Sequence, residues 1–451
     1  MKYSDLLEKY DVPAPRYTSY PTVPYWSDSP RTEQWLEALR QGFQQAERVP
    51  WSLYIHTPFC ESLCTFCGCN TSITKNHDKE LPYVNHIVRE FDLYVQKVPE
   101  FLSHPLKEIH LGGGSPTWFS AENLKRMVAP ILDRVKICPD DFDGAIEVDP
   151  RRATLEQLKT LFDLGFRRIS LGIQDFNPET QRLVNRIQPY ELTKSVNDMA
   201  RDLGYTSVNF DLIYGLPMQT PESVRDMAMR TLELRPDRIA LYSFAKVPWI
   251  KPAQRLFKDE DLPEGPAKRE LYEIAREVLI SGGYLEIGMD HFALESDGLA
   301  IAQSKGKLHR NFMGYTGKRT DVLLGLGVSS ISEAPTCFHQ NEKVLPVYER
   351  QVDGGEIPTF RGHLLTAEDQ KQREQILEFM TRGRVRLHDG AQEADVKEFL
   401  APLIADQIVS VKGGLMELTP KGFPFLRNVC MALDLRLRRE KPETKVFSQA
   451  L

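Results

Sequence analysis

Short apolar runs alternate along this chain with segments in which apolar residues recur every three or four positions. Apolar runs bounded by turn residues predict buried strands, and the three-to-four spacing predicts amphipathic helices. Strands are therefore expected at residues 52–56, 108–111, 144–148, 168–172, 207–213, 238–242 and 285–289. Helices are expected at residues 32–45, 81–97, 121–135, 155–164, 192–203, 221–234 and 267–280.

Capping residues support several of these helices. Ser120, Thr154 and Thr220 directly precede expected helices, and such side chains accept hydrogen bonds from the first turn. Gly165 and Gly204 follow two of the helices, where glycine commonly ends them. Regular alternation of strand and helix predicts parallel βαβ units, hence an α/β sheet or barrel.

The pattern changes near residue 340. Residues 1–50 are expected to form an arm that caps the barrel, and residues 51–340 to form the barrel. A polar connection is expected at 341–361, followed at 362–451 by a small, mainly helical, winged-helix-like domain. Within that domain the expected elements are helices at 366–382, 393–404 and 425–438 and a strand pair at 408–418.

Composition narrows the class of protein. Of 451 residues, 41% are apolar and 27% are charged, which is ordinary for a soluble globular protein. No apolar run is long enough to span a membrane, and the first residues lack the apolar core of a signal peptide. We therefore expect a cytoplasmic protein. The net charge of −6 argues against a general nucleic-acid binder.

Cysteine is concentrated in one loop. Four of the seven cysteines, Cys60, Cys64, Cys67 and Cys69, lie within ten residues after the first expected strand. So dense a group in a reducing compartment usually binds metal. A single zinc ion is one alternative, although zinc sites generally use two separated pairs of ligands. The C-x3-C-x2-C spacing of the first three cysteines favours an iron–sulfur cluster.

Polar motifs follow the expected strands at the same end. In order along the chain they are residues 110–117 with three consecutive glycines, 147–150, 172–176, 211–217 and 242–245. Loops at this end of parallel strands converge, and active sites of α/β barrels are built there. The glycine run can be a tight turn or a place where the backbone approaches a ligand.

The cysteine loop, with Phe66 before the third cysteine, resembles the signature of the radical S-adenosylmethionine (SAM) enzymes. This resemblance implies a partial (β/α) barrel of parallel strands. It also implies that Cys60, Cys64 and Cys67 bind a [4Fe–4S] cluster whose fourth iron binds SAM. Reduction of SAM would then give a 5′-deoxyadenosyl radical.

Within that superfamily the sequence closely resembles the oxygen-independent coproporphyrinogen III oxidases, also called coproporphyrinogen dehydrogenases. The resemblance extends over nearly the whole chain and includes residues 15–21, 54–60, 185–189, 288–292, 309–312, 325–331 and 418–422. It implies that two propionates of coproporphyrinogen III are decarboxylated to vinyl groups, giving protoporphyrinogen IX.

The resemblance also implies two SAM molecules in one site. Tyr54, Gly113 and Glu147 would bind the molecule at the cluster. The second molecule would be bound by Phe66, Gly114, Ser115, Gln174, Arg186, Asp211, Ala245 and Ile331. Cys69 would support catalysis without binding iron. A monomer is expected, supplied with electrons by a donor such as flavodoxin or ferredoxin.

A substrate with four carboxylates needs local cations. Arg16, Arg310 and Arg319 lie in motif-like stretches, and arginine can bind carboxylate through two hydrogen bonds. Each can equally be a surface arginine. The rival functions are a haem carrier of the same superfamily, a haem-modifying radical enzyme and a zinc-stapled interaction protein. The carriers characteristically lack the arm motif at 16–21 and have an aromatic residue where Cys69 stands, which favours the enzyme.

Overall fold

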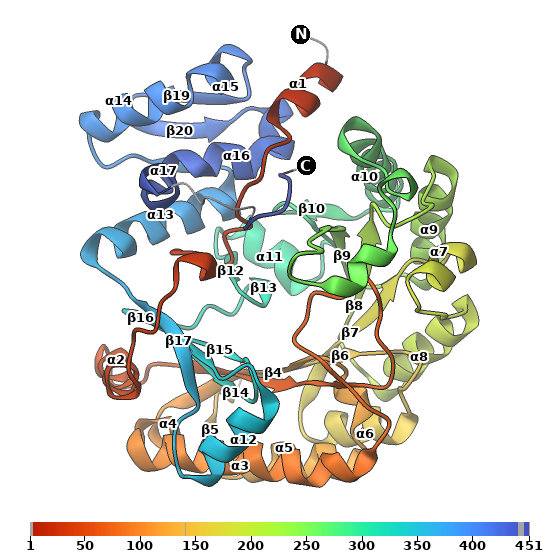
Figure 1. The fold of residues 1–451 in the computed structure, drawn as a ribbon, viewed down its shortest axis with the longest axis vertical. Coiled ribbons are helices and arrows are strands. Elements are labelled where there is room, and N and C mark those ends of the chain that lie inside the picture. The colour runs from red at the N-terminus through yellow and green to blue at the C-terminus, as the bar shows by residue number, and fades with distance from the viewer. Residues whose placement is uncertain (1–2, 140, 441–445, 451) are drawn as a thin grey trace.

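The computed structural model describes residues 3–139, 141–440 and 446–450. Its largest element is a 13-stranded sheet whose central strands are parallel (Figure 1). These parallel strands, in spatial order, are β9 (Arg238–Ser243), β8 (Ser207–Tyr214), β7 (Phe166–Gln174), β6 (Asp143–Val148), β4 (Pro105–Gly113), β1 (Trp51–Thr57) and β14 (Val322–Leu326). The short β5 (Lys136–Ile137) pairs with β4.

Antiparallel strands extend both edges of the parallel region. On one side lie β11 (His291–Ala293) and β10 (Leu285–Ile287). On the other side lie β15 (Ile331–Ala334), β16 (Cys337–Asn341) and β17 (Thr359–Leu364). The strand expected at 285–289 is therefore present but shorter. The α/β class with a partial barrel is confirmed, and the described strands do not close into a full barrel.

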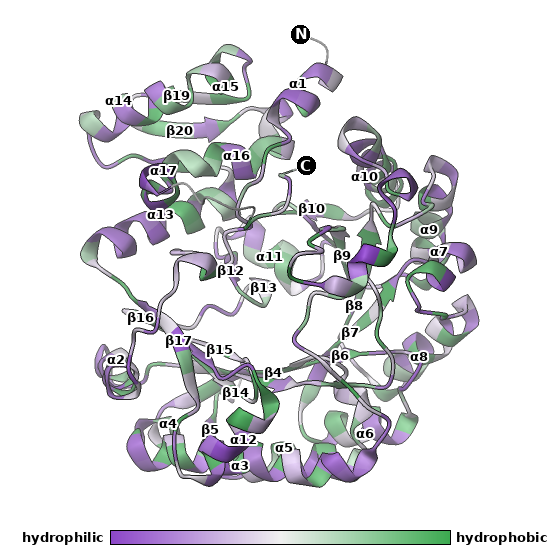
Figure 2. Cartoon of the chain, in the orientation of Figure 1, coloured by the Kyte–Doolittle hydropathy of each residue, from purple (hydrophilic) through white to green (hydrophobic). Residues whose placement is uncertain are grey.

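Amphipathic helices alternate with the parallel strands and bury their apolar sides against the sheet (Figures 1 and 2). They are α3 (Glu80–Lys97), α5 (Ala121–Leu132), α6 (Leu155–Asp163), α8 (Tyr190–Leu203), α9 (Pro221–Leu234) and α10 (Gly265–Ser281). The expected caps are confirmed: Ser120, Thr154 and Thr220 each accept a hydrogen bond from the first turn. Gly204 ends α8 in the left-handed conformation. Local signals therefore set these helix boundaries.

Several short elements lie between the main ones. They are β2 (Phe59–Cys60), β3 (Ser72–Ile73), α4 (Glu100–Ser103), α7 (Pro178–Leu183), α11 (Gly298–Ser304), β12 (His309–Asn311) and β13 (Gly314–Thr316). Segment 341–361, expected to be a polar connection, contains helix α12 (Leu345–Asp353) and the start of β17. The helix forms because Tyr348 and Val352 are buried against the core of the barrel.

The C-terminal unit packs around its own apolar core. It comprises α13 (Ala367–Arg382), β18 (Arg384–Arg386), α14 (Gly390–Phe399), α15 (Ala401–Ala405), β19 (Val409–Lys412), β20 (Leu415–Leu418), α16 (Leu426–Cys430) and α17 (Leu435–Arg439). One continuous helix at 425–438 was the wrong expectation. Asp434 caps α17 through the backbone N–H of Leu437, which begins a new helix inside that range.

The first fifty residues contact both parts of the molecule. Helix α1 (Tyr3–Tyr10), which the sequence pattern did not indicate, packs in the core of the C-terminal unit. Helix α2 (Thr32–Gln44) confirms the expected helix and packs against the barrel. Between them, the guanidinium of Arg427 donates hydrogen bonds to the carbonyls of Ala14 and Pro15 and to those of Gln449 and Ala450. One buried cation thus joins the two ends of the described chain.

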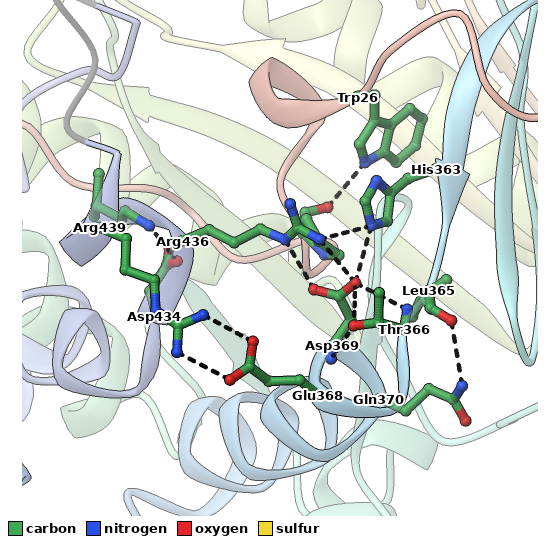
Figure 3. A network of polar contacts seen from close by, with 12 residues as sticks. Trp26, His363, Leu365, Thr366, Glu368, Asp369, Gln370, Asp434, Arg436 and Arg439 are labelled. Atoms are coloured by element: carbon green, nitrogen blue, oxygen red, sulfur yellow. Dashed lines mark hydrogen bonds and ion pairs between the residues drawn. The ribbon is translucent and has the colours of Figure 1, made fainter.

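A polar network joins α13 and α17 to β17 (Figure 3). Asp369 accepts hydrogen bonds from Arg436 Nε at 2.8 Å and Nη2 at 2.9 Å, and it lies 3.1 Å from His363 Nε2. Its carboxylate also caps α13 through the N–H and hydroxyl of Thr366. Although burial alone would raise it, these donors hold the pKa of Asp369 far below its usual value. The network fixes the first helix of the C-terminal unit to the edge of the sheet.

None of the described helices combines the length and the apolarity that a membrane span requires.

Candidate active site

The loops after the parallel strands meet around a cavity of about 260 Å³. The cysteine loop and the ends of β4, β6, β7 and β8 contribute to its wall. Among the expected site residues, those that line it are Cys60, Cys64, Phe66, Cys67, Cys69, Gly113, Gly114, Glu147, Gln174, Arg186 and Asp211. Eleven positions that are spread over 152 residues of sequence therefore line one cavity.

The cysteine loop is fixed by contacts from elements distant in sequence. The short parallel pair β2 and β3 closes its base. Asn185 Nδ2 donates to the carbonyl of Leu63 at 2.7 Å, and the N–H of Thr65 donates to the carbonyl of Val184 at 3.1 Å. From the loop after β9, Lys251 Nζ donates to the carbonyl of Cys69 at 2.7 Å. These hydrogen bonds hold the loop through its backbone and not through its thiols.

The thiols occupy different environments. Cys64 is buried, Cys60 and Cys67 are half-buried, and Cys69 is exposed. Burial raises the pKa of Cys60 to about 12. The hydrogen bond with Cys69 and the charge of Lys251 lower the pKa of Cys67. Within the part of the chain that the structure describes, no three potential ligands converge on a point where one metal ion could bind.

Two arginines approach the buried thiol. Arg151 Nη2 lies 3.6 Å and Arg186 Nη1 lies 3.7 Å from Cys64 Sγ. Both also bind Asp149, with Arg151 Nη2 at 2.7 Å and Arg186 Nη2 at 3.3 Å. Although burial would raise it, Arg186 and Arg151 hold the pKa of Asp149 below its usual value. Three thiolates and a reduced cluster carry negative charge, so adjacent guanidinium groups fit such a group.

The glycine run of residues 112–114 forms a turn that brings backbone to the cavity. Gly113 has a φ of 112°, which favours glycine, and a Cβ there would lie 2.5 Å from the His56 ring. A Cβ on Gly114 would lie 2.8 Å from the backbone of Pro58. The run is therefore a crowded turn that also lines the cavity, and the approach of a ligand to its backbone stays a prediction.

Glu147 lies opposite this turn at the end of β6. Its Oε2 accepts a hydrogen bond from the N–H of Gly113 at 3.0 Å, and its Oε1 lies 3.1 Å from His110 Nε2. These partners hold the pKa of Glu147 below its usual value even though burial opposes this. Glu147 is therefore ionised at neutral pH, and it presents a carboxylate that can accept hydrogen bonds from a ribose or an ammonium.

A second cavity of about 110 Å³ continues into the interior of the barrel. It shares Glu147, Ser170, Asp211 and Tyr242 with the first cavity. Asp211 accepts hydrogen bonds from Ser170 Oγ at 2.7 Å and Asn209 Nδ2 at 2.9 Å. Burial nevertheless raises the pKa of Asp211. The two cavities are therefore adjacent and have part of their polar lining in common.

Four of the expected site residues do not line the first cavity. Tyr54 is buried in β1 and its hydroxyl lies 3.1 Å from His56 Nδ1. Ser115 is buried with its hydroxyl 3.2 Å from that of Thr117. Ala245 follows the end of β9, and Ile331 begins β15 and packs against a small apolar cluster. The roles implied for these four residues stay predictions.

The three candidate arginines separate into two groups. Arg310 is 4% exposed, and its Nε and Nη1 have no hydrogen-bond partner among the described residues. Its guanidinium lies 4.5 Å from the centre of the Tyr315 ring. Arg16 Nη2 donates to the carbonyl of Ser243 at 3.1 Å, at the end of β9. Arg319 is instead on the surface, 3.3 Å from Asp321, which matches the alternative of a surface arginine.

Sequence reasoning missed several residues of this site. Arg151 follows the expected strand end at 147–150 directly, so its position in the sequence could have indicated it. Lys251 and Gln254 hold the carbonyls of Cys69 and Phe66 from a loop with no periodic pattern. Only the folded arrangement identifies these two residues.

Comparison with known proteins gives three findings. Residues 54–230 match the radical SAM superfamily. The chain is 40% identical to the oxygen-independent coproporphyrinogen III oxidase of Escherichia coli (strain K12), over 99% of this chain and 98% of that protein. It is 35% identical to the enzyme of the same name from Paracoccus denitrificans, over 94% of each chain. A solved structure of coproporphyrinogen III oxidase (HemN) from Escherichia coli, described as a radical SAM enzyme, matches with a TM-score of 0.87 at 39% identity, covering 93% of this chain and 97% of that one.

Proposed function

Because this chain belongs to the oxygen-independent coproporphyrinogen III oxidases of the radical SAM superfamily, we propose that it converts two propionates of coproporphyrinogen III to vinyl groups, giving protoporphyrinogen IX. The observation that carries the proposal is the cavity in which the cysteine loop meets Glu147, Arg186 and Asp211. A cavity of this kind brings thiols, an anion and a cation together where parallel strands end.

Cys60, Cys64 and Cys67 would hold the [4Fe–4S] cluster. All three line one cavity, and Arg151 and Arg186 stand beside Cys64. When bound, the cluster and SAM supply the electron and the adenosyl radical for hydrogen abstraction from the substrate. The residues of the chain bind and orient these groups, and Phe66 packs over an apolar cluster at the wall and helps to exclude water.

Two SAM molecules would occupy the joined cavities. The backbone at Gly113 and the carboxylate of Glu147 suit the amino-acid part and ribose of the molecule at the cluster. Gln174, Arg186 and Asp211 line the same wall and suit the second molecule. Tyr54, Gly114, Ser115, Ala245 and Ile331 complete the proposed set. The adjacency of the two cavities, which share four lining residues, supports this arrangement.

The substrate carboxylates would meet Arg310 and Arg16. A buried guanidinium with two nitrogens that lack partners among the described residues is costly unless a ligand pairs with it, and a propionate would satisfy Arg310. His291 and Arg310 lower the pKa of Asp290 even though burial opposes this. Asp290 is therefore an anion, and its charge partly balances the cations near it. We propose a monomer that receives electrons from flavodoxin or ferredoxin.

The test is an anaerobic assay of the reconstituted protein. With dithionite, SAM and coproporphyrinogen III, we expect both 5′-deoxyadenosine and protoporphyrinogen IX. Formation of 5′-deoxyadenosine without decarboxylated product would overturn the oxidase assignment. Unchanged substrate affinity in Arg310→Ala would overturn only the role of Arg310 in binding a substrate carboxylate. Cys69→Ser should keep the visible absorption of the cluster while it lowers turnover.

A further inference from the structure

We propose that Lys251, Lys343, Phe360 and Arg361 form a docking surface for a small acidic one-electron carrier protein. This set of four residues is called the basic rim. The inference rests on the proposed function, since only an enzyme that consumes electrons one at a time needs such a partner. It adds where the carrier binds and which charges select it.

The basic rim adjoins the cysteine loop through two hydrogen bonds. Lys251 Nζ donates to the carbonyl of Cys69 at 2.7 Å. Asn70 Nδ2 donates to the carbonyl of Lys343 at 3.0 Å. Both contacts are to residues that lie two and three positions after Cys67, the last of the expected cluster ligands. A protein bound at the basic rim therefore lies against the same loop that carries the cluster.

An exposed aromatic ring lies at the centre of the basic rim. Phe360 is 42% exposed, although apolar rings of this size are usually buried. The Nζ of Lys343 lies 5.6 Å and the Cζ of Arg361 lies 5.5 Å from the centre of its ring. Neighbours in sequence are also apolar and exposed: Val344 at 54% and Ile250 at 59%. Aromatic residues and arginine on such a surface are typical of binding hot spots.

The charges of the basic rim are not neutralised within the chain. Among the residues placed by the structure, no carboxylate forms an ion pair with Lys251, Lys343 or Arg361. The charge of Glu342 acts on Lys343 in the opposite direction to the two neighbouring cations, but it is the weakest of the influences on the pKa of Lys343. Partial burial, and then the charges of Arg361 and Lys251, lower the pKa of Lys343. In a chain of net charge −6, this is a local concentration of uncompensated positive charge. It suits an anionic partner surface, which relieves the mutual repulsion.

A protein fits the basic rim better than the porphyrinogen does. The candidate cations for the substrate, Arg16 and Arg310, contact Ser243 and Tyr315, which are not residues of the rim. Lys343 and Phe360 are exposed and neither lines the two cavities of the site. Exposed apolar side chains with cations beside them are the complement of an acidic carrier whose redox group is near its surface.

The experiment compares two reductants on the reconstituted holoenzyme. The variant is Lys343→Glu with Arg361→Glu, and the control is Arg384→Glu, an exposed arginine on β18 of the C-terminal unit. With reduced flavodoxin at low salt, we expect turnover of the double variant to fall at least about tenfold, because charge reversal removes electrostatic steering. With dithionite its turnover should equal that of the parent protein. The control should match the parent with both reductants.

The outcomes separate this inference from the proposed function. Parent-like turnover of the double variant with flavodoxin would overturn the docking surface and leave the oxidase assignment intact. Equal loss with both reductants would also overturn it, by showing that the rim supports the loop instead. No turnover of the parent with dithionite would overturn the proposed function itself. A salt dependence that is steep in the parent and flat in the double variant would support docking.

Discussion

Arginine side chains are fully paired around Asp369 but incompletely paired around Cys64. At Asp369, both carboxylate oxygens accept hydrogen bonds from Arg436, and the group also caps α13 (Figure 3). At Cys64, Arg186 has a buried Nε with no partner among the described residues, and the guanidinium–sulfur distances are long. A network whose groups are all paired stabilises the fold, whereas incomplete pairing indicates a place for a ligand.

Two buried arginines repeat the contrast. Arg427 donates from each of its three guanidinium nitrogens to backbone carbonyls. Arg310 leaves Nε and Nη1 without partners in the described structure. Arg427 contacts the arm from the C-terminal unit, whereas Arg310 lies in β12 beside Tyr315. Burial alone therefore does not separate a structural arginine from one that binds a ligand, and the count of free N–H groups does.

The largest expected effect comes from the incompletely paired region. Cys64→Ser should remove the visible absorption of the reconstituted cluster and reduce turnover below detection, because a ligand is lost. Its control is Cys138→Ser, a half-buried cysteine outside the site. Iron analysis and absorption spectra check both variants. Retention of the full absorption by Cys64→Ser would contradict the assignment of this ligand.

The second effect tests the fully paired network. Asp369→Ala leaves Arg436 without its carboxylate, so we expect the free energy of unfolding of the C-terminal unit to fall by about 3–5 kcal/mol. Urea denaturation followed by circular dichroism measures this change. The iron content of the folded, reconstituted variant should stay normal, because the Asp369 network is not part of the candidate active site. A loss of iron at unchanged stability would mean that the two regions do not differ as stated.

Glu90 is a buried carboxylate whose hydrogen-bond donors are all neutral, and no described cation forms an ion pair with it. Glu90 accepts hydrogen bonds from the N–H of Gly327, Asn341 Nδ2 and Tyr348 Oη, yet burial raises its pKa to about 7. The pKa of Glu90 is higher in the folded protein than in the unfolded chain. The contribution of Glu90 to the free energy of unfolding is therefore greatest below about pH 4.3, and it falls as the pH rises towards 7. Between pH 4 and pH 8 the ionisation of Glu90 should lower the free energy of unfolding by roughly 3 kcal/mol, and Glu90→Gln should remove this pH dependence. Unfolding curves at both pH values check it, and an unchanged slope would contradict it.

The smallest effect is expected at an exposed pair in the same view. Arg439 donates to Glu368 at 2.9 and 3.0 Å, beside the Asp369 network (Figure 3). Because more than half of each side chain is exposed, Glu368→Ala should change the free energy of unfolding by about 0–1 kcal/mol. The same denaturation series measures it. A cost close to that of Asp369→Ala would show that burial does not distinguish the two pairs.

The sequence predicted what depends on local pattern. The apolar runs located the parallel strands, and Thr154 and Thr220 located helix starts, since both signals act over a few residues. Helix α12 was missed because only Tyr348 and Val352 in it are buried. The positions of Lys251 and Gln254 depend on contacts 182 and 188 positions away, which no local pattern encodes. The site was therefore predicted where motifs follow strands and missed where loops cross over.

The carbonyls that Arg427 gathers have a consequence for biosynthesis. Pro15 lies 412 positions before this arginine, and Gln449 follows it by 22. A ribosome therefore makes the whole barrel before the arm at Pro15 has its partner. The carbonyls of Ala14 and Pro15 therefore lack these hydrogen bonds until the C-terminal unit has been synthesised. The arm thus completes its contacts only after residues 51–340 have left the ribosome.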